Sequence, residues 1–475
     1  MFSSQDKKLP SLPEVFRSVP VPKSGGWFRR LLAFAGPGYL VSVGYMDPGN
    51  WGTDLAGGAK YNYALLWVIL ASNLMAILLQ TLCARLGLVT GRDLAQSCRD
   101  YYKKPAAVAL WLLCEIAIVA CDLAEVIGSA VALNLLFHIP LVAGVLITGL
   151  DVLVLLGLMK FGFRKIEAIV VTLVGSIAAC FAVLIFSAHP DWGGVARGLV
   201  TPVLPDKEAL FIALGILGAT VMPHNLYLHS SIVQTRAHDR ESPEGMRHAV
   251  GSATLDTVIA LGLAFFVNAA ILIVAAAAFH ATGRTDVQEL KEAHRLLTPI
   301  LGGASATVFA VALLASGQSS TITGTLAGQI VMEGFLNIHI APWLRRLITR
   351  GLAIIPAMIL ITIKGGTGTV GLLVLSQVVL SMQLSFAIFP LMMFTSDRRK
   401  MGDFANPLWL KLLGYLVCFL IAGLNIKLLW DTLGPFWTSI SMGVVALFSA
   451  YVKFVYKSAP VVSDGSEAEG IASTL

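Results

Sequence analysis

The sequence predicts an all-α protein that crosses a membrane many times, and three observations support this. Of its 475 residues, 56% are hydrophobic and only 13% are charged. A soluble domain is nearer a quarter charged, so this composition excludes a soluble chain. The apolar residues form about twelve long stretches, and most basic residues lie in alternate connections between them.

Each apolar stretch is long enough to cross the hydrocarbon core as a helix, which takes about 20 residues. A lipid-facing β-barrel would need alternating segments of about ten residues, whereas these stretches are continuously apolar. About twelve transmembrane helices are therefore expected. They cover residues 31–57, 62–84, 106–137, 141–159, 166–187, 208–234, 251–281, 303–336, 347–363, 369–395, 407–430 and 434–456.

The basic residues predict the orientation of these helices. The two terminal segments and the even-numbered loops hold 26 of the 34 Lys and Arg residues, and the odd-numbered loops hold 8. Because cytoplasmic loops are enriched in Lys and Arg, both termini are expected in the cytoplasm of a bacterial-type inner membrane. The net charge of +6 is thus a topology signal and does not indicate nucleic-acid binding.

The two ends of the chain are expected outside the membrane. Residues 1–30 are polar and basic, which predicts a cytoplasmic segment and no cleaved signal peptide. Residues 457–475 are rich in Ser, Gly and acidic residues and are predicted to be a disordered cytoplasmic tail. The six cysteines show no CxxC spacing, so buried thiols are expected rather than disulfides or a structural zinc site.

Two of the predicted helices are interrupted near their centres. The first reads GYMDPGN at residues 44–50, and the sixth reads ATVMPHN at residues 219–225. Proline removes a helix donor and glycine is permissive, so both segments should unwind. Irregular backbone at membrane depth is tolerated only where protein or a water-filled cavity satisfies it. Corresponding interruptions in two halves of a chain indicate a secondary transporter with its site near the bilayer midplane.

The residues at the two breaks suit a divalent transition metal. Freed carbonyls near Gly44 and Ala219, together with the side chains of Asp47 and Asn50, form an oxygen-rich and negative site. Met222 adds a thioether, a soft ligand that favours later transition metals over calcium and magnesium. The metal is expected to be cargo, and no cofactor is expected.

At these residues the sequence resembles the Nramp family of proton-coupled divalent metal transporters. The resemblance rests on DPGN at 47–50, MPHNLYLHSS at 222–231 and GQSSTITGTLAGQIVMEGF at 317–335, and it covers roughly residues 35–400. It implies a transporter rather than an enzyme. It also implies a LeuT-like fold, with residues 31–187 and 208–395 as inverted repeats of five helices and peripheral helices 11 and 12 within residues 407–456.

The resemblance also assigns the metal ligands. They are Asp47, Asn50 and Met222, with backbone carbonyls from Gly44 and Ala219. The family often has alanine where this chain has Gly44, a difference that keeps the carbonyl but changes the local flexibility. Gln377 corresponds to the family's extra ligand in the occluded state, and Gln383 is the alternative.

The third apolar stretch carries the predicted proton pathway. Asp122 and Glu125 share one helix face at a spacing of three residues, and intramembrane acids mark proton relays or paired charges. Arg350 is the expected countercharge, and His224 supplies a group that titrates near neutrality. The family resemblance supports these four residues. Glu115, on the same stripe, is expected to be an interfacial carboxylate.

The predicted function is import of Mn²⁺ and Fe²⁺ with protons by alternating access. Its partners would be divalent metal ions, protons and the lipid bilayer, and a monomer would suffice because one chain contains both repeats. The alternative is a sodium-coupled amino-acid transporter of the same fold, although Asp47 would repel a substrate carboxylate. An intramembrane enzyme is not supported, because no nucleophile lies at a usable spacing from a base.

Overall fold

The computed structural model describes residues 10–21, 33–150, 163–240, 242–287, 289–301, 303–338, 340–364 and 368–451. The predicted disordered tail, residues 457–475, lies outside them. Over the first half of the chain the elements are η2 (Pro13–Val15), β1 (Val19–Pro20), α2 (Pro37–Gly44), α3 (Pro48–Tyr61), α4 (Leu66–Thr90), α5 (Leu94–Tyr101), α6 (Lys104–Phe137), α7 (Leu141–Thr148), α9 (Phe163–Ala188) and α10 (Trp192–Val200).

The second half continues the helical bundle. Its elements are α11 (Lys207–Thr220), α12 (Pro223–Ile232), η3 (Val233–Thr235), β2 (Arg236–Ala237), α13 (Pro243–Ala278), η4 (His280–Thr282), α14 (Leu290–Leu301), α15 (Gly303–Leu336), α16 (Pro342–Lys364), α17 (Thr369–Ser396), α18 (Arg398–Met401), η5 (Gly402–Phe404) and α19 (Leu408–Ala450). The prediction of an all-α membrane protein is confirmed.

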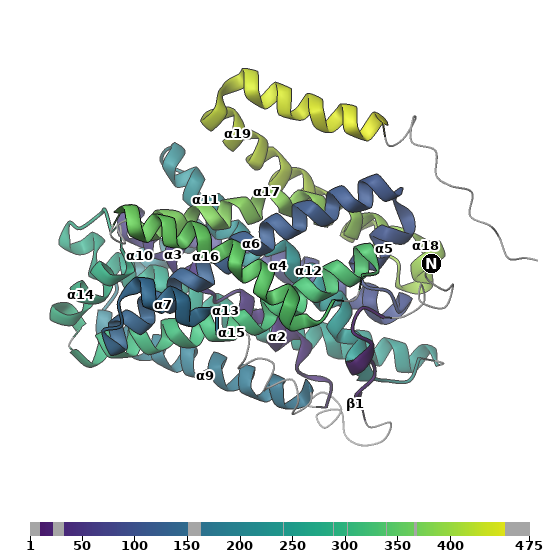
Figure 1. Cartoon of the computed structure of the whole chain (residues 1–475), viewed down its shortest axis with the longest axis horizontal. Helices are drawn as coiled ribbons and strands as arrows, with labels where there is room; N and C mark the ends of the chain where they lie inside the picture. The colour runs from purple at the N-terminus through teal and green to yellow at the C-terminus, as the bar shows by residue number, and fades with distance from the viewer. Residues whose placement is uncertain are drawn as a thin grey trace, which may run out of the picture.

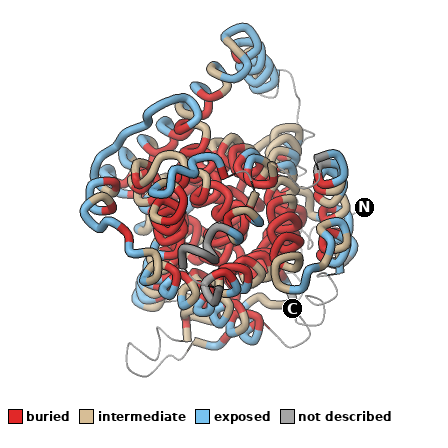
Figure 2. The backbone as a smooth tube through the Cα atoms, turned by 90° about the vertical axis from the view of Figure 1, so that its left-hand side faces the viewer, coloured by how far each residue is buried: buried red, intermediate tan, exposed pale blue. Residues whose placement is uncertain are grey.

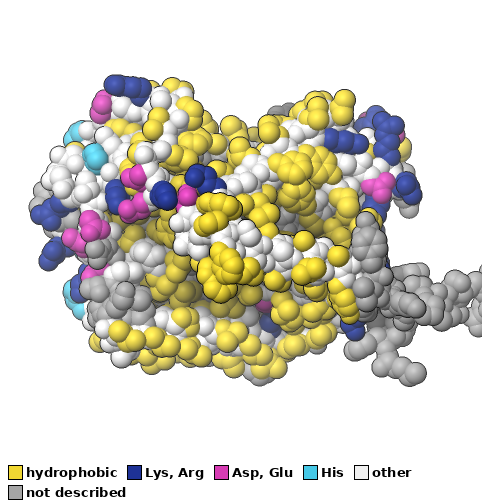
Figure 3. Space-filling model, turned by 90° about the horizontal axis from the view of Figure 1, so that it is seen from above, with side chains coloured by type: hydrophobic (Ala, Val, Ile, Leu, Met, Phe, Trp, Pro, Cys, Tyr) yellow, Lys and Arg dark blue, Asp and Glu magenta, His cyan; other side chains and the backbone are white. Residues whose placement is uncertain are grey.

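The helices form a bundle that is elongated along one axis (Figure 1). Helices α10 and α14 lie at one end, and β1, α5 and α18 lie at the other, which we call the sheet end. Hydrophobic side chains dominate the middle of the face seen in Figure 3, and charged side chains gather toward its two ends. This distribution fits a bilayer whose normal runs along the long axis.

Eight helices of the described chain are long and apolar enough to span a membrane. The first predicted span is instead divided into α2 and α3, and the fourth runs beyond α7 into residues that are not described. The eleventh and twelfth are joined in α19, but Gly434 at φ 82° and the following Pro435 break its helical backbone. The expectation of twelve crossings therefore stays a prediction.

The two interrupted helices lie at the centre of the bundle. Buried backbone gathers there, whereas the second half of α19 projects away and is exposed (Figures 1 and 2). Helix α3 contacts α11, and α2 contacts α12. Trp51 of α3 is fully buried and packs edge to face on Phe181 and Phe309. The other helices therefore enclose the breaks, as irregular backbone in a membrane requires.

Candidate metal and proton site

Asp47 ends the first break and starts α3. Its Oδ1 atom accepts a hydrogen bond of 2.9 Å from the backbone N–H of Asn50, and Pro48 occupies the first helical position. Aspartate at the N-cap followed by proline is a favoured helix start. The side chain is fully buried and lies at the positive end of the α3 dipole. Local sequence thus places an acid at the break.

Three oxygen atoms from both broken helices converge on the side chain of Asn50. Its Nδ2 atom lies 2.7 Å from Oδ1 of Asp47, 3.4 Å from the carbonyl oxygen of Gly44 and 3.3 Å from that of Ala219. Both carbonyls belong to the last turn of a helix, where they have no partner within the helix. A cation in place of this nitrogen would meet the same three oxygens.

Met222 faces the same space from the second break. Nδ2 of Asn225 lies 3.5 Å from its sulfur, and a methyl group at position 44 would lie 3.2 Å from that sulfur. The methyl group would also overlap the Asn225 amide. Glycine at position 44 thus leaves room for Asn225, so the difference from the family's common alanine affects packing as well as flexibility.

Neighbouring helices hold the unwound backbone of the first break. Nδ2 of Asn268, on α13, donates to the carbonyl of Tyr45 at 2.8 Å and to Oδ1 of Asn50 at 3.3 Å. Ser316, on α15, donates to the carbonyl of Met46 at 2.5 Å. Sequence reasoning did not single out Ser316, although a polar residue within an apolar stretch was the available signal.

Helix α17 covers the site on the side away from the sheet end. A methyl group at Gly49 would overlap the Gln377 amide, and one at Gly52 would overlap Leu373. Oε1 of Gln377 is buried and has no hydrogen-bond partner among the described residues. Gln383 lies six residues further along, about 9 Å on a helix axis. The structure therefore brings Gln377, not Gln383, against the segment that carries Asp47 and Asn50.

A cavity of about 260 Å³ lies beyond this contact, toward the end with α10 and α14. Residues of α3, α11 and α17 line it, together with the segment that precedes α14; they include Ala56, Lys60, Glu208, Ile212, Asp286 and Val374. Gly215 of α11 packs against Thr53 and against Val374, which lines the cavity. A close-packed layer of α17 thus separates the cavity from the oxygen cluster.

The predicted countercharge pair is present on the other side of the site. NH1 of Arg350 lies 3.2 Å from Oε2 of Glu125, and both side chains are 1% exposed. Thr321 donates to the same carboxylate oxygen at 3.0 Å and accepts from NH2 of Arg350 at 2.8 Å. The pair is fully desolvated, which requires such additional hydrogen bonds.

The remaining predicted proton groups lie nearby. Cys121 of α6, which precedes Asp122 in the chain, lies with its Sγ atom 3.8 Å from Oδ2 of Asp47. The His224 side chain is 2% exposed, and its Nδ1 atom has no hydrogen-bond partner among the described residues. The structure therefore connects the metal-site carboxylate to the acids of α6.

Glu115 forms an ion pair with an arginine of α16. NH2 of Arg345 contacts its two oxygens at 2.7 and 2.8 Å, and Nε1 of Trp111 donates to it at 3.0 Å. The Arg345 side chain is 7% exposed and that of Glu115 is 17% exposed. The sequence did not indicate the partner that α16 supplies, and the interfacial position of Glu115 stays a prediction.

A second polar chain lies between α2, α4 and α12. Nδ1 of His229 lies 3.0 Å from Oε1 of Gln80, and Nε2 of Gln80 donates to the hydroxyl of Tyr45 at 2.8 Å. All three side chains are fully buried. The sequence did not indicate this chain of contacts, which connects the half-helices across α4.

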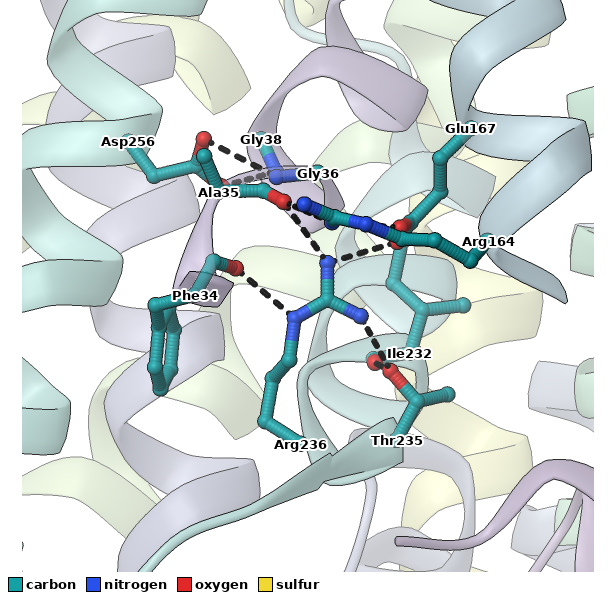
Figure 4. A network of polar contacts seen from close by, with 10 residues as sticks. All are labelled: Phe34, Ala35, Gly36, Gly38, Arg164, Glu167, Ile232, Thr235, Arg236 and Asp256. Atoms are coloured by element: carbon teal, nitrogen blue, oxygen red, sulfur yellow. Dashed lines mark hydrogen bonds and ion pairs between the residues drawn. The ribbon is translucent and has the colours of Figure 1, made fainter. Parts of the chain in front are cut away.

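Arg236 fixes the start of α2 near the sheet end (Figure 4). Its Nε and NH2 atoms donate to the carbonyls of Phe34 and Ala35 at 2.7 and 3.0 Å. NH2 also lies 2.7 Å from Oε1 of Glu167 on α9, and both charged side chains are buried. Gly36 has φ 145°, a conformation that favours glycine, and a side chain there would overlap this ion pair.

Asp256 holds the same helix start from the opposite side. Its two carboxylate oxygens accept from the backbone N–H groups of Gly36 and Gly38 at 3.2 and 2.7 Å. These are among the unpaired donors of a helix N-terminus, where negative charge is also favoured. Glu167, Arg236 and Asp256 were not predicted as functional residues. The two acids lie within predicted apolar stretches, which was a usable signal.

Part of the predicted N-terminal segment covers this region. Val19 pairs with Arg236 in a two-stranded parallel sheet of β1 and β2. Ser11 donates to Oδ2 of Asp93 at 2.5 Å, and Asp93 forms a capping box with Gln96 at the start of α5. The strand pairing and the Ser11 contact place this segment against the connections between the helices.

The donor set at the breaks differs from a zinc-enzyme site. Among the described residues, no three His, Cys, Asp or Glu side chains are grouped to hold a metal. The converging groups are instead one carboxylate, backbone carbonyls, amide groups and a thioether. Such a set can coordinate a cation without a cluster of charged ligands.

Comparison with known proteins identifies the family to which this arrangement belongs. Residues 38–431 match the family of natural resistance-associated macrophage protein-like proteins, Nramp. The chain belongs to the Nramp family. It is 60% identical over 427 residues to the divalent metal cation transporter MntH of Nostoc sp., covering 89% of this chain and 96% of that protein. MntH of Listeria monocytogenes is 56% identical over 430 residues, with coverages of 90% and 96%.

Solved structures support the Nramp fold. A manganese transporter of Eremococcus coleocola matches with a TM-score of 0.85 at 39% identity, covering 94% of this chain and 98% of that one. The nucleobase-cation-symport-1 family transporter Mhp1 matches with a TM-score of 0.57 at 15% identity, with coverages of 86% and 93%, and shows the fold alone. This Nramp chain is a membrane transporter, not an enzyme.

Proposed function

We propose that this Nramp protein imports Mn²⁺ and Fe²⁺ together with protons by alternating access. The observation that carries the proposal is the convergence of the Asp47 carboxylate and the carbonyls of Gly44 and Ala219 on one point. The names of the relatives support a divalent metal as cargo. The sulfur of Met222 favours a transition metal over calcium and magnesium.

For the metal to bind, the Asn50 amide must rotate. Its nitrogen lies within 3.4 Å of all three oxygens of the cluster. Rotation about the last side-chain bond would turn Oδ1 inward and complete a fourth oxygen ligand. Gln377, whose Oε1 has no partner among the described residues, is the further candidate ligand. A bound cation would give the buried Oε1 atom of Gln377 the partner that it lacks among the described residues.

Proton coupling follows from the charge at Asp47. An arriving dication favours its ionised form, so a proton is displaced toward Glu125, Asp122 and His224. Arg350 holds Glu125 in the fully buried pair described above. One metal with one proton carries three charges, worth about 7 kcal/mol per 100 mV when the inside is negative. Import would therefore be strongly downhill.

Alternating access requires the site to open at each end in turn. We assign the sheet end to the cytoplasm, because the basic terminal segment and even-numbered loops lie on that side. The cavity of about 260 Å³ then faces outward, and α17 must move away from Gly49 and Gly52 to connect it with the site. Release of α2 from Arg236 and Asp256 would open the cytoplasmic side.

Purified protein in sealed vesicles tests this proposal. Mn²⁺ uptake and internal pH are followed together under an inward proton gradient with the inside negative. We expect Mn²⁺ to enter with acidification, and collapse of the gradient by a protonophore to slow the uptake. If Mn²⁺ stays outside while a neutral amino acid enters with sodium, the amino-acid alternative replaces this proposal.

A further inference from the structure

We infer that Cys121 of α6 is a specificity residue of the metal site and offers a second sulfur to thiophilic cations. The inference rests on the proposed function and concerns which metals the site accepts. Sequence reasoning treated this cysteine as a buried thiol without a role. Its position in the structure assigns it one.

Cys121 contacts the carboxylate on which the site depends. Its Sγ atom lies 3.8 Å from Oδ2 of Asp47, within hydrogen-bonding distance for sulfur. The other oxygen, Oδ1, accepts both contacts from Asn50. Asn50 and Cys121 therefore contact different oxygen atoms of the same carboxylate.

The two sulfur atoms belong to one group of buried side chains. Cys121 and Met222 form a small apolar cluster with Ala117 and Leu380. The Asn225 amide lies against the Met222 sulfur, and Oδ1 of Asn225 is fully buried without a partner among the described residues. A buried amide oxygen without a partner is rare in a folded protein, and a bound cation would supply the partner that it lacks.

The separation of sulfur and oxygen suits a shared cation. Zinc-like bonds of about 2.3 Å to sulfur and about 2.1 Å to oxygen place the two ligands about 3.6 Å apart at the tetrahedral angle. The observed separation of 3.8 Å is close to this value. Cys121 and Asp47 can therefore flank one cation without movement of either helix.

The chemistry predicts which cations gain from the second sulfur. Mn²⁺ is suited by carboxylate and carbonyl oxygens, whereas sulfur ligands select softer metals such as Cd²⁺ and Zn²⁺. Cys121 should thus change the ratio of Cd²⁺ to Mn²⁺ uptake more than it changes Mn²⁺ uptake itself. Met222 contributes in the same direction.

Uptake of Cd²⁺ and Mn²⁺ into vesicles, each metal alone, tests the inference with Cys121→Ser. Serine keeps the shape and a hydrogen-bond donor but replaces the soft atom. We expect the Cd²⁺ to Mn²⁺ ratio to fall by about five-fold or more. The matched control is Cys114→Ser, also buried on α6 and seven residues earlier, about two helical turns away. It should keep the ratio of the natural protein.

X-ray absorption of the Cd²⁺-loaded protein supplies a readout independent of transport. Two sulfur neighbours of cadmium are expected in the natural protein and in Cys114→Ser, and one in Cys121→Ser. An unchanged uptake ratio, or one sulfur neighbour in the natural protein, overturns the inference while Mn²⁺ uptake upholds the proposed function. If Cys121→Ser does not fold, Cys121→Ala is subjected to both measurements.

Discussion

The Nδ2 atom of Asn50 lies 2.7 Å from Oδ1 of Asp47 and holds the carbonyls of both broken helices in the same network. The contact pairs the site's acid with a donor that a cation must displace. The charge of Asp47, rather than its shape, is then the main source of metal affinity. Asparagine at position 47 would preserve the N-cap of α3, because it caps helices as well as aspartate does.

We therefore expect Asp47→Asn to fold normally and to lose metal affinity. Mn²⁺ binding measured by calorimetry should weaken at least about 100-fold, equivalent to about 2.8 kcal/mol. Asp54→Asn is the matched control, because Asp54 is also buried on α3 but lies two turns beyond Asp47. Equal affinities in the two variants would show that the carboxylate at the break is not a ligand.

Glu125→Gln should separate proton movement from metal binding. The substitution removes the carboxylate that pairs with Arg350 but leaves the oxygen cluster intact. Mn²⁺ affinity should stay within about three-fold, or about 0.7 kcal/mol, while acidification of the vesicle interior is lost. Glu208→Gln provides the control, since it removes an acid from the exposed pair with Lys60. Undiminished acidification in Glu125→Gln would remove this residue from the proton pathway.

Arg236→Ala should destabilise the sheet end and release α2. It removes the buried partner of Glu167, which keeps only its pair with the exposed Arg164 at 2.9 Å. Breaking a buried pair costs about 3–5 kcal/mol when the charge is left uncompensated, so the loss here should lie below that range. Hydrogen–deuterium exchange should rise selectively between residues 33 and 44, because two carbonyls there lose a donor. Lys427→Ala, which breaks an exposed pair with Asp431, should cost only about 0.2–1 kcal/mol. Unaltered exchange at residues 33–44 would contradict the role of Arg236.

Burial of Asp93 beside the N-terminal segment should make the stability of the folded protein depend on pH. Burial raises the pKa of Asp93 to about 6, opposed by its hydrogen bonds from Ser11 and Gln96. The folded protein then binds a proton more tightly than the unfolded chain, so stability is greatest at low pH and decreases as pH rises to about 6. The shift from 3.8 corresponds to about 3 kcal/mol.

The test compares thermal unfolding of the natural protein and Asp93→Asn between pH 4 and 8. The stability difference between them should change by about 2 kcal/mol between pH 4 and 6 and become constant above about pH 7. The asparagine variant keeps an acceptor for the helix cap and removes only the titration. A difference that does not vary with pH would show that the buried carboxylate does not titrate there.

The breaks could be placed from the sequence because proline and glycine act locally. Asp47-Pro48 starts α3 and Met222-Pro223 starts α12, as the motifs indicated. The pairing of Arg350 with Glu125 was also anticipated, because a buried acid in an apolar helix requires a countercharge. The pairing of Arg345 with Glu115 could not be derived, because it depends on how α16 is rotated against α6.

The sequence by itself determined that the protein is helical and lies in a membrane, that two helices are broken, and which acids lie at membrane depth. These properties follow from composition and from residues adjacent in the chain. Only the tertiary structure decided which groups meet: Asn50 with Gly44 and Ala219, Arg236 with Glu167, and Cys121 with Asp47. Each contact joins different elements of the fold, and the packing that brings them together depends on the whole bundle.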